Sequence, residues 1–178
     1  MPISITVTET DYMLPEDGEQ ASQDFIGLFT STEAGDTFYV SAYDFTYRPM
    51  YDAIKQADSN GVVFHLLLDE SCAQEGEEKS QLLSLVQSFQ ASGSGSTITI
   101  TTAGLNSPEP KVIWHWKALV RVSDSTCWEG STNFTSTAWD EGNSCRKFTS
   151  SIWAEAFVNQ FKAHEAWARQ NLPNVQVM

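Results

Sequence analysis

The architecture of this chain can be read from residues 37–69, which run TFYVSAYDFTYRPMYDAIKQADSNGVVFHLLLD. Residues 37–42 are typical of a buried strand, and Pro49 suits the first turn of a helix that ends at Asn60–Gly61. Residues 62–68 form a near-continuous apolar run, as expected of a central strand covered on both faces. The segment therefore predicts a strand, a helix and a second strand, which is the building unit of an α/β protein.

The flanking sequence continues this alternation of strands and helices. From hydrophobic spacing we expect strands at residues 3–8, 97–102 and 148–153, and helices at residues 19–30, 80–90 and 155–170. Residues 91–96, ASGSGS, have the composition of a flexible linker, and residues 105–110 are expected to form a loop. We therefore predict one domain over residues 1–178, built as an α/β mixed β-sheet flanked by helices on both faces.

Composition describes a folded but strongly acidic protein. Hydrophobic residues make up 41% of the 178 residues, and the formal net charge is −13. Nine acidic residues precede Arg48, and no Lys or Arg lies among them. This balance argues against a nucleic-acid-binding protein of the usual basic kind, which binds the phosphate backbone over a wide area. We expect the acidic half to be a solvated surface; the alternative is a nucleic-acid mimic or a surface that repels duplex.

Cysteine usage and the chain start bear on the compartment. The three cysteines, Cys72, Cys127 and Cys145, show no Cys-x-x-Cys spacing. An odd count without that spacing argues against a disulfide framework or a zinc site, so we expect free thiols, with a Cys127–Cys145 bridge as the alternative. The first residues lack the basic start and apolar run of a signal peptide, and no segment has membrane-spanning length. We expect a cytoplasmic protein without membrane insertion.

The strongest functional signal lies in two segments, WHWKALVRV at residues 114–122 and CWEGSTNFT at residues 127–135. His115 and Lys117 are two residues apart on an expected strand, so their side chains should share one face of the sheet. The returning strand ends in Gly130, Ser131, Thr132 and Asn133, which adds a hydroxyl and an amide. A nucleophilic imidazole, a fixed cation and small donors are the groups that a phosphodiester needs.

These residues resemble the signature of the phospholipase D superfamily: His-x-Lys, four residues, Asp, then about six residues and Gly-Ser-x-Asn. The matching positions are His115, Lys117, Gly130, Ser131 and Asn133. Residues 37–46 and 49–69 resemble the first core strand and the next helix and strand of that family. The resemblance implies a phospholipase D-like sandwich and a reaction without metal or cofactor. In that reaction the histidine forms a phosphohistidine, while the lysine and asparagine hold the phosphate oxygens.

The sequence departs from this signature at the acidic position. Val122 stands four residues after the motif lysine, where the family has Asp, and Asp124 follows two residues later. Either Asp124 takes the role of orienting the histidine, or the acid is lost. Arg121 and Trp139 are further candidates for contact with substrate. Glu141 would reach the site only if the alignment shifts.

The chain carries a single copy of the motif, whereas the implied reaction needs two histidines. His65 and His164 lack a Lys two residues later, so we expect both to be structural. The second histidine should come from a second copy in a two-fold homodimer. The leading hypothesis is a nuclease-like phosphodiesterase acting on single-stranded or short nucleic acid. The alternatives are a catalytically impaired binding or inhibitory protein that uses its acidic surface, and an enzyme acting on a lipid headgroup or small phosphodiester.

Overall fold

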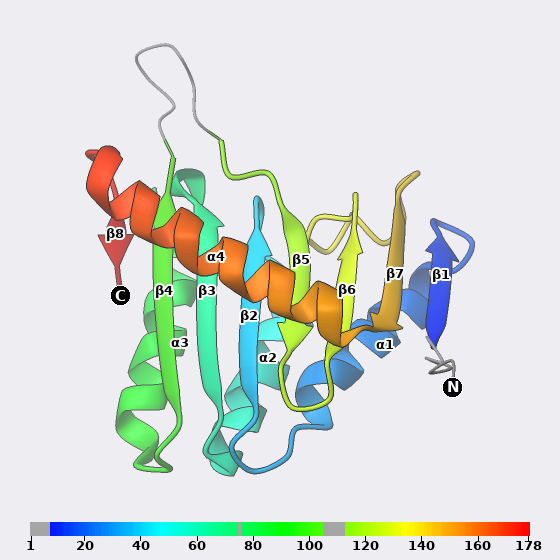
Figure 1. The fold of residues 1–178 in the computed structure, drawn as a ribbon, viewed down its shortest axis with the longest axis horizontal. Helices are drawn as coiled ribbons and strands as arrows, with labels where there is room; N and C mark the ends of the chain where they lie inside the picture. Colours follow the sequence, from blue (N-terminus) through cyan, green and yellow to red (C-terminus); the bar gives the residue numbers. More distant parts are fainter. Residues whose placement is uncertain (1–7, 75, 105–112) are drawn as a thin grey trace, which may run out of the picture.

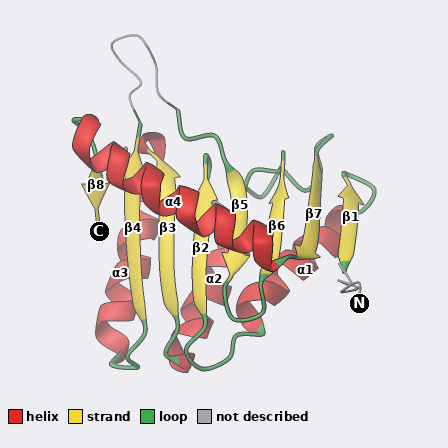
Figure 2. Ribbon diagram, in the orientation of Figure 1, coloured by secondary structure: helices red, strands yellow, loops and turns green. Residues whose placement is uncertain are grey.

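A computed structural model describes residues 8–74, 76–104 and 113–178 and confirms the predicted α/β class. One eight-stranded mixed sheet has the order β1-β7-β6-β5-β2-β3-β4-β8 (Figure 1). The strands are β1 (Glu9–Met13), β2 (Thr37–Ala42), β3 (Val63–Asp69), β4 (Thr97–Ala103), β5 (Lys117–Arg121), β6 (Thr126–Gly130), β7 (Ser144–Thr149) and β8 (Gln176–Val177). The helices are α1 (Gly18–Thr30), α2 (Arg48–Ala57), α3 (Glu77–Ser92) and α4 (Ser151–Asn171). Helices α1, α2 and α3 cover one face, and α4 crosses the other (Figure 2).

The sheet changes from parallel to antiparallel pairing at its centre. Strands β2, β3 and β4 run parallel, whereas β5 runs antiparallel to β2 and continues into β6, β7 and β1. In the β2–β5 pair, Ala42 at the end of β2 lies opposite Lys117 at the start of β5. The residues that follow β2 and those that precede β5 are therefore brought to the same edge of the sheet.

Local sequence signals explain the helix boundaries. Pro49 lies in the first turn of α2, as predicted, where its missing N–H is tolerated. A short 3₁₀ turn (η1, Asp58–Asn60) follows α2, and Gly61 then adopts a left-handed φ of 69°. Helix α4 begins after Ser150, whose side chain accepts a hydrogen bond from the backbone N–H of Trp153.

Two sequence predictions of local structure need correction. Residues 91–96 are not a flexible linker, because α3 continues to Ser92 and the turn that follows is hydrogen-bonded to Asp58. The hydroxyls of Ser92 and Ser94 donate to Asp58 Oδ1 at 3.1 and 2.8 Å. The strand predicted at residues 148–153 occurs at Ser144–Thr149, and α4 begins directly afterwards. The predictions for residues 3–7 and for the loop at residues 105–110 lie outside the described residues.

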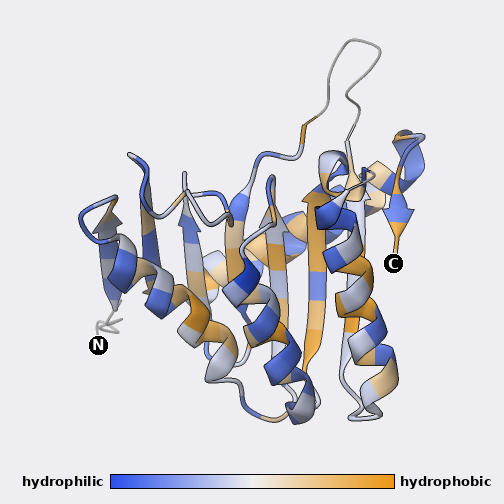
Figure 3. Ribbon diagram, turned by 180° about the vertical axis from the view of Figure 1, so that it is seen from behind, coloured by the Kyte–Doolittle hydropathy of each residue, from blue (hydrophilic) through white to orange (hydrophobic). Residues whose placement is uncertain are grey.

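Hydrophobic packing occupies both faces of the sheet. The larger cluster lies between the sheet and helices α1–α3 and is rich in aromatic rings; the Phe25 ring, for example, lies 5.2 Å from the Trp128 ring. Seen from that side, the hydrophobic colour is concentrated in the central strands. Hydrophobic and hydrophilic residues alternate along the helices (Figure 3). A smaller cluster under α4 includes Val120, Phe157 and Phe161. The predicted free thiols are confirmed, since all three cysteines are buried and unpaired.

Candidate active site

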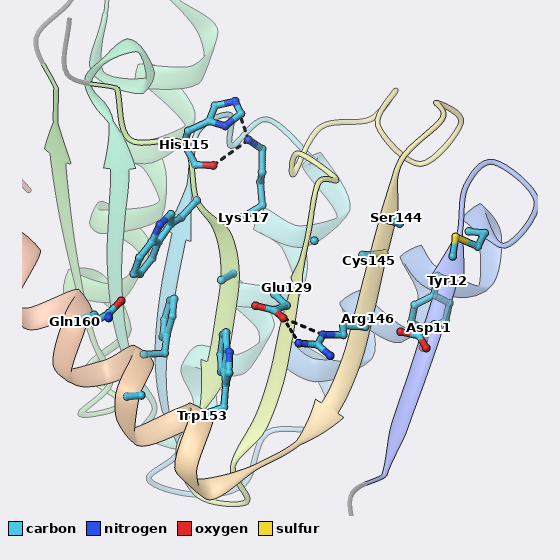
Figure 4. Close-up of a pocket in the computed structure, with 16 residues that line it drawn as sticks. Asp11, Tyr12, His115, Lys117, Glu129, Ser144, Cys145, Arg146, Trp153 and Gln160 are labelled. Carbon is cyan, nitrogen blue, oxygen red and sulfur yellow. Dashed lines mark hydrogen bonds and ion pairs between the residues drawn. The ribbon is translucent and has the colours of Figure 1, made fainter. Parts of the chain in front are cut away.

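The centre of the site is the contact between His115 and Lys117, at the start of β5 (Figure 4). Lys117 Nζ lies 2.9 Å from His115 Nε2 and donates a hydrogen bond to the His115 carbonyl oxygen at 3.0 Å. His115 is exposed, whereas Lys117 is only 6% exposed. The predicted proximity of these two side chains is thus confirmed. The Lys117 ammonium therefore lies against one ring nitrogen of an exposed histidine.

The segment that follows β2 packs against this pair and was missed by sequence reasoning. The Tyr43 ring lies 4.9 Å from the His115 ring, and Lys117 Nζ lies 5.5 Å from the centre of the Tyr43 ring. Burial raises the pKa of Asp44, while the Lys117 charge acts in the opposite direction. Burial lowers the pKa of Lys117, and Asp44 opposes that effect. The charges of Asp44 and Lys117 therefore act on one another, although the two residues are 73 positions apart in the sequence.

Gly130 and Ser131 form the end of the β6–β7 ladder beside the site. A Cβ atom at Gly130 would lie 2.3 Å from the Ser144 carbonyl oxygen, so the close approach of the two strands requires glycine. The Ser131 hydroxyl donates to the Ser144 carbonyl at 3.3 Å and accepts from the Ser144 N–H at 3.0 Å. These contacts give Ser131 the role of holding the end of β7 in place.

Asn133 lies close to the same edge of the sheet. The backbone N–H of the next residue, Phe134, donates to the Asp44 carbonyl oxygen at 3.3 Å. Asn133 Oδ1 is buried and has no hydrogen-bond partner among the described residues. Because a buried polar atom without a partner is costly, the Asn133 amide is a candidate for contact with a ligand.

A cavity of about 640 Å³ opens beside the histidine, on the α4 side of the sheet. His115, Lys117 and Gly130 line it, together with Glu129, Arg146 and Trp153 (Figure 4). Arg146 is held by two carboxylates, with its Nε 2.8 Å from Glu129 Oε1 and its Nη1 2.8 Å from Glu9 Oε1. The positive charge of Arg146 is therefore already balanced inside the cavity.

The structure does not bring Asp124 or Arg121 to this site, which corrects both assignments. Arg121 lies opposite Phe38, at the far end of β5 from Lys117, and four residues of strand span about 13 Å. Arg121 instead pairs with Asp124, with Nη2–Oδ2 and Nε–Oδ1 distances of 2.7 and 3.1 Å. Burial acts to raise the pKa of Asp124, but hydrogen bonds from Arg121 and Thr126 outweigh it and leave that pKa lowered. This carboxylate therefore fixes the β5–β6 turn.

Trp139 and Glu141 also lie away from the histidine. Trp139 is 4% exposed and packs in the core beneath α1, with its ring 5.4 Å from the rings of Phe25 and Tyr47. Its assignment as a substrate contact is therefore corrected to core packing. Glu141 is exposed in the loop before β7 and does not line the cavity.

The two other histidines pack against aromatic rings. His65 stacks on Tyr39 with ring centres 4.7 Å apart. His164, in α4, lies 5.3 Å from the Trp114 ring and 5.1 Å from the Trp116 ring. These contacts are those of packed side chains, in agreement with the structural role expected for both.

Neither a metal centre nor a membrane span is found in residues 8–74, 76–104 and 113–178. Within those ranges, no three His, Cys, Asp or Glu side chains are grouped so that they could hold a metal ion. No described helix combines the length and apolar character needed to cross a bilayer.

Comparisons with known proteins identify the family. In fold the chain is similar to NucT from Helicobacter pylori (TM-score 0.73, 16% identity, covering 89% of this chain and 95% of that one). It is similar to Nuc, a phospholipase D family member from Salmonella typhimurium (TM-score 0.70, 20% identity, covering 89% of this chain and 93% of that one). It is also similar to phosphatidylserine synthase from Haemophilus influenzae Rd KW20 (TM-score 0.63, 14% identity, covering 100% of this chain and 41% of that one). Comparison with curated protein sequences gives no match. The sequence model described as cardiolipin synthase, PLD-like domain, matches residues 29–165, and the chain therefore belongs to the phospholipase D-like family.

Proposed function

We propose that this protein is a phosphodiesterase that cleaves nucleic acid through a phosphohistidine on His115, in a site completed by a second copy of the chain. The observation that carries the proposal is the 2.9 Å contact between Lys117 Nζ and the exposed His115 imidazole. A cation at that distance would lie against the oxygens of a phosphate attacked by the ring. It would stabilise the negative charge that develops there.

The proposed reaction has two steps. As Lys117 Nζ passes its hydrogen bond from His115 Nε2 to a phosphate oxygen, the freed Nε2 lone pair attacks phosphorus. The phosphorus–oxygen bond to the leaving group breaks, and the leaving oxygen takes a proton from a second histidine. That histidine, now neutral, removes a proton from water, and the resulting hydroxide displaces His115 from phosphorus. Lys117 and the Asn133 amide would hold the non-bridging oxygens throughout.

A second copy of the chain is the proposed source of the second histidine. Among the described histidines, His65 and His164 are engaged in ring packing. The cavity beside His115 carries Met13, which is 63% exposed, on its rim, and Ile152 nearby in α4 is 74% exposed. A two-fold contact over this side would cover these apolar groups and bring two His115 side chains to one site.

Nucleic acid is the proposed substrate class. The chain covers 95% of NucT and 93% of Nuc, but only 41% of phosphatidylserine synthase, so its extent matches the two smaller proteins. An acidic chain would meet a polyanion through a local site rather than a broad basic surface, which suits a short or single-stranded substrate better than long duplex.

The first test is cleavage of short single-stranded DNA and RNA in the presence of a chelator. Purified protein should cleave, and His115→Ala should lose all detectable cleavage. His65→Ala serves as the matched control, because that ring stacks on Tyr39 away from the site, and it should retain activity once folding is verified. Cleavage by His115→Ala would reject the proposal.

The second test asks whether two copies share one site. Wild-type and His115→Ala chains are mixed at equal amounts under conditions in which subunits exchange. If each site needs two histidines, the mixture should show about one quarter of the activity of the same total amount of wild-type protein. The reason is that only dimers of two wild-type chains, about one quarter of all dimers, are active. Retention of half the activity, or a monomer by light scattering, would contradict the shared site.

The alternative function is binding or inhibition by a catalytically impaired member of the family. It is favoured by Val122 at the acidic motif position and by the pairing of Asp124 with Arg121. A folded protein that binds but never cleaves oligonucleotides would support this alternative. Cleavage of phosphatidylcholine or cyclic nucleotides alone would instead assign a lipid or small-molecule substrate.

A further inference from the structure

A second cavity, the aromatic pocket, adjoins the larger cavity at His115. Its volume is about 430 Å³. The described residues that line it are Ile113, Trp114, His115, Trp116, His164 and Trp167. His115 and Trp116 also line the larger cavity of about 640 Å³, and α4 contributes side chains to both. A ligand bound at His115 therefore has the aromatic pocket directly beside it.

Buried hydrogen bonds and ring contacts fix the inner wall of the aromatic pocket. The backbone N–H of Trp114 donates to Asp69 Oδ2 at 2.7 Å, and the Trp114 indole Nε1–H donates to the Ser41 hydroxyl at 3.1 Å. Both acceptors are buried, since Asp69 is 1% and Ser41 is 0% exposed. The Trp116 ring packs against α4, 5.1 Å from the His164 ring. The wall is therefore in place before any ligand binds, which lowers the entropic cost of binding.

The outer part of the aromatic pocket exposes apolar surface, and one polar atom in it has no partner. Trp167 is 46% exposed and Ile113 is 49% exposed, although both are large apolar side chains. His164 Nδ1 is buried and has no hydrogen-bond partner among the described residues. Both features are costly in water, and a ligand that covers the apolar groups and hydrogen-bonds the nitrogen removes both costs. The pocket therefore has the properties of a binding site.

The chemistry of the aromatic pocket suits a flat, uncharged ligand with a polar edge. The described residues that line it include three tryptophans and two histidines, and no Asp, Glu, Lys or Arg. Indole rings stack on flat rings, and they do so with every nucleobase because each base has a π-face. A nucleobase is uncharged, and its edge carries both donors and acceptors, so it can pair with His164 Nδ1 in either tautomer of that ring. A base within a duplex is already paired and stacked, so only an unpaired base is free to enter.

We propose that the aromatic pocket binds one unpaired nucleobase of the substrate, stacked on Trp167, while the neighbouring phosphate lies at His115 and Lys117. The inference rests on the proposed function and deepens it, because it names the part of the substrate that is bound beside the reacting phosphate. In a single strand each base is joined to the next phosphate through one sugar, so the base beside the scissile phosphate reaches a pocket that shares His115 with the site. The protein then selects single strands by stacking rather than by a broad basic surface.

The first experiment measures the Kd of short single-stranded DNA by fluorescence anisotropy, in chains that all carry His115→Ala so that cleavage does not interfere. Trp167→Ala should raise Kd by about tenfold, as expected for loss of one base–aromatic stack. Trp167→Phe keeps a ring and should restore most of the affinity. Leu83→Ala, which removes an exposed apolar side chain from α3 on the opposite face of the sheet (Figure 2), is the matched control and should leave Kd unchanged. Equal Kd values for Trp167→Ala and its parent would overturn the inference.

The second experiment tests whether Trp167 contacts a particular base. An abasic site replaces one nucleotide of the oligonucleotide at a time, and Kd is measured for the parent and for Trp167→Ala. At one position the abasic site should weaken binding to the parent by about the same factor as the tryptophan substitution. At that position it should cause no further loss in Trp167→Ala, because the two changes remove the same contact. Losses that add at every position would show that the indole stacks on no base and would overturn the inference.

The outcomes separate this inference from the proposed reaction. If Trp167 and one base are coupled but the wild-type protein never cleaves, the reaction fails and the base-binding pocket stands. If the wild type cleaves but no coupling is found, the reaction stands and the inference fails. If no oligonucleotide binds, the inference is overturned. A fluorescence change with phosphatidylcholine vesicles that Trp167→Phe abolishes would then assign the pocket to an acyl chain.

Discussion

Lys117 Nζ lies 2.9 Å from His115 Nε2, although Lys117 is almost entirely buried and His115 is exposed. The ammonium reaches the imidazole from inside the protein, so one side of the ring is held while the other faces solvent. A side chain fixed in this way loses little freedom when a substrate binds, which is the physical basis of a preorganised site.

Removal of the buried cation should impair catalysis more than stability. In Lys117→Met the side chain keeps nearly the same length and loses its charge. We expect kcat for oligonucleotide cleavage to fall by about 10²–10³, the range typical for loss of one group that stabilises developing charge. Single-turnover kinetics would measure the effect, with circular dichroism to verify folding. A variant with wild-type kcat would exclude Lys117 from the reaction.

The Arg121–Asp124 pair should contribute to stability in a pH-dependent way. Since the pKa of Asp124 is lowered in the folded state, its stabilisation is present above the pKa of the unfolded chain and is lost as the pH falls through the folded value. Asp124→Asn should therefore be less stable by about 0.5–1 kcal/mol at neutral pH, because the pair is partly exposed. Urea unfolding should show the difference shrinking as the pH falls below about 4, the pKa of Asp in an unfolded chain. A constant difference over pH would refute this assignment.

Restoring the motif acid at position 122 should not raise activity. The Val122 N–H donates to the Thr37 carbonyl at 2.9 Å, at the end of the sheet opposite to His115. A carboxylate in Val122→Asp would be exposed and too distant to orient the imidazole. Rates of oligonucleotide cleavage should therefore equal those of the wild type. An increase of tenfold or more would show that the acid at this position reaches the site.

Trp139 should behave as a core residue. Trp139→Ala removes a large ring from the packing beneath α1 and should cost about 3–5 kcal/mol of unfolding free energy. Trp139→Phe keeps most of the ring and also removes an indole N–H that has no hydrogen-bond partner among the described residues, so the loss should stay below about 1.5 kcal/mol. Denaturant titration measures both. A rise in KM without a loss of stability would instead indicate contact with substrate.

Gly130 should tolerate no side chain, because the close approach of its strand to β7 leaves no room for a Cβ. In Gly130→Ala the added atom would meet the Ser144 carbonyl oxygen and the Cys145 Cα at 2.3 and 2.6 Å, and we expect a loss of about 1–3 kcal/mol. Gly27→Ala is the matched control. Gly27 lies inside α1 with open space around it, so alanine there should raise the free energy of unfolding by about 0.5–1 kcal/mol. Thermal unfolding would check that Gly130→Ala is less stable than the wild type and that Gly27→Ala is more stable.

Much of the architecture was accessible from local sequence patterns. Residues 37–42 were predicted as a strand and form β2, because a short apolar run suits a strand covered on both faces. The linker predicted at residues 91–96 was wrong, because its serines bind Asp58, which lies more than 30 residues away. Composition reports local flexibility but contains nothing about such distant partners.

The sequence by itself determined that His115 and Lys117 would meet, because side chains two residues apart in extended chain point to the same side. Only the tertiary structure decided which other side chains lie against them. Asp124 is close in sequence but lies at the far end of β5, whereas Tyr43 is distant in sequence and its ring lies against both members of the pair. The physical reason is that strand pairing and register arise from packing over the whole sheet, which no local pattern encodes.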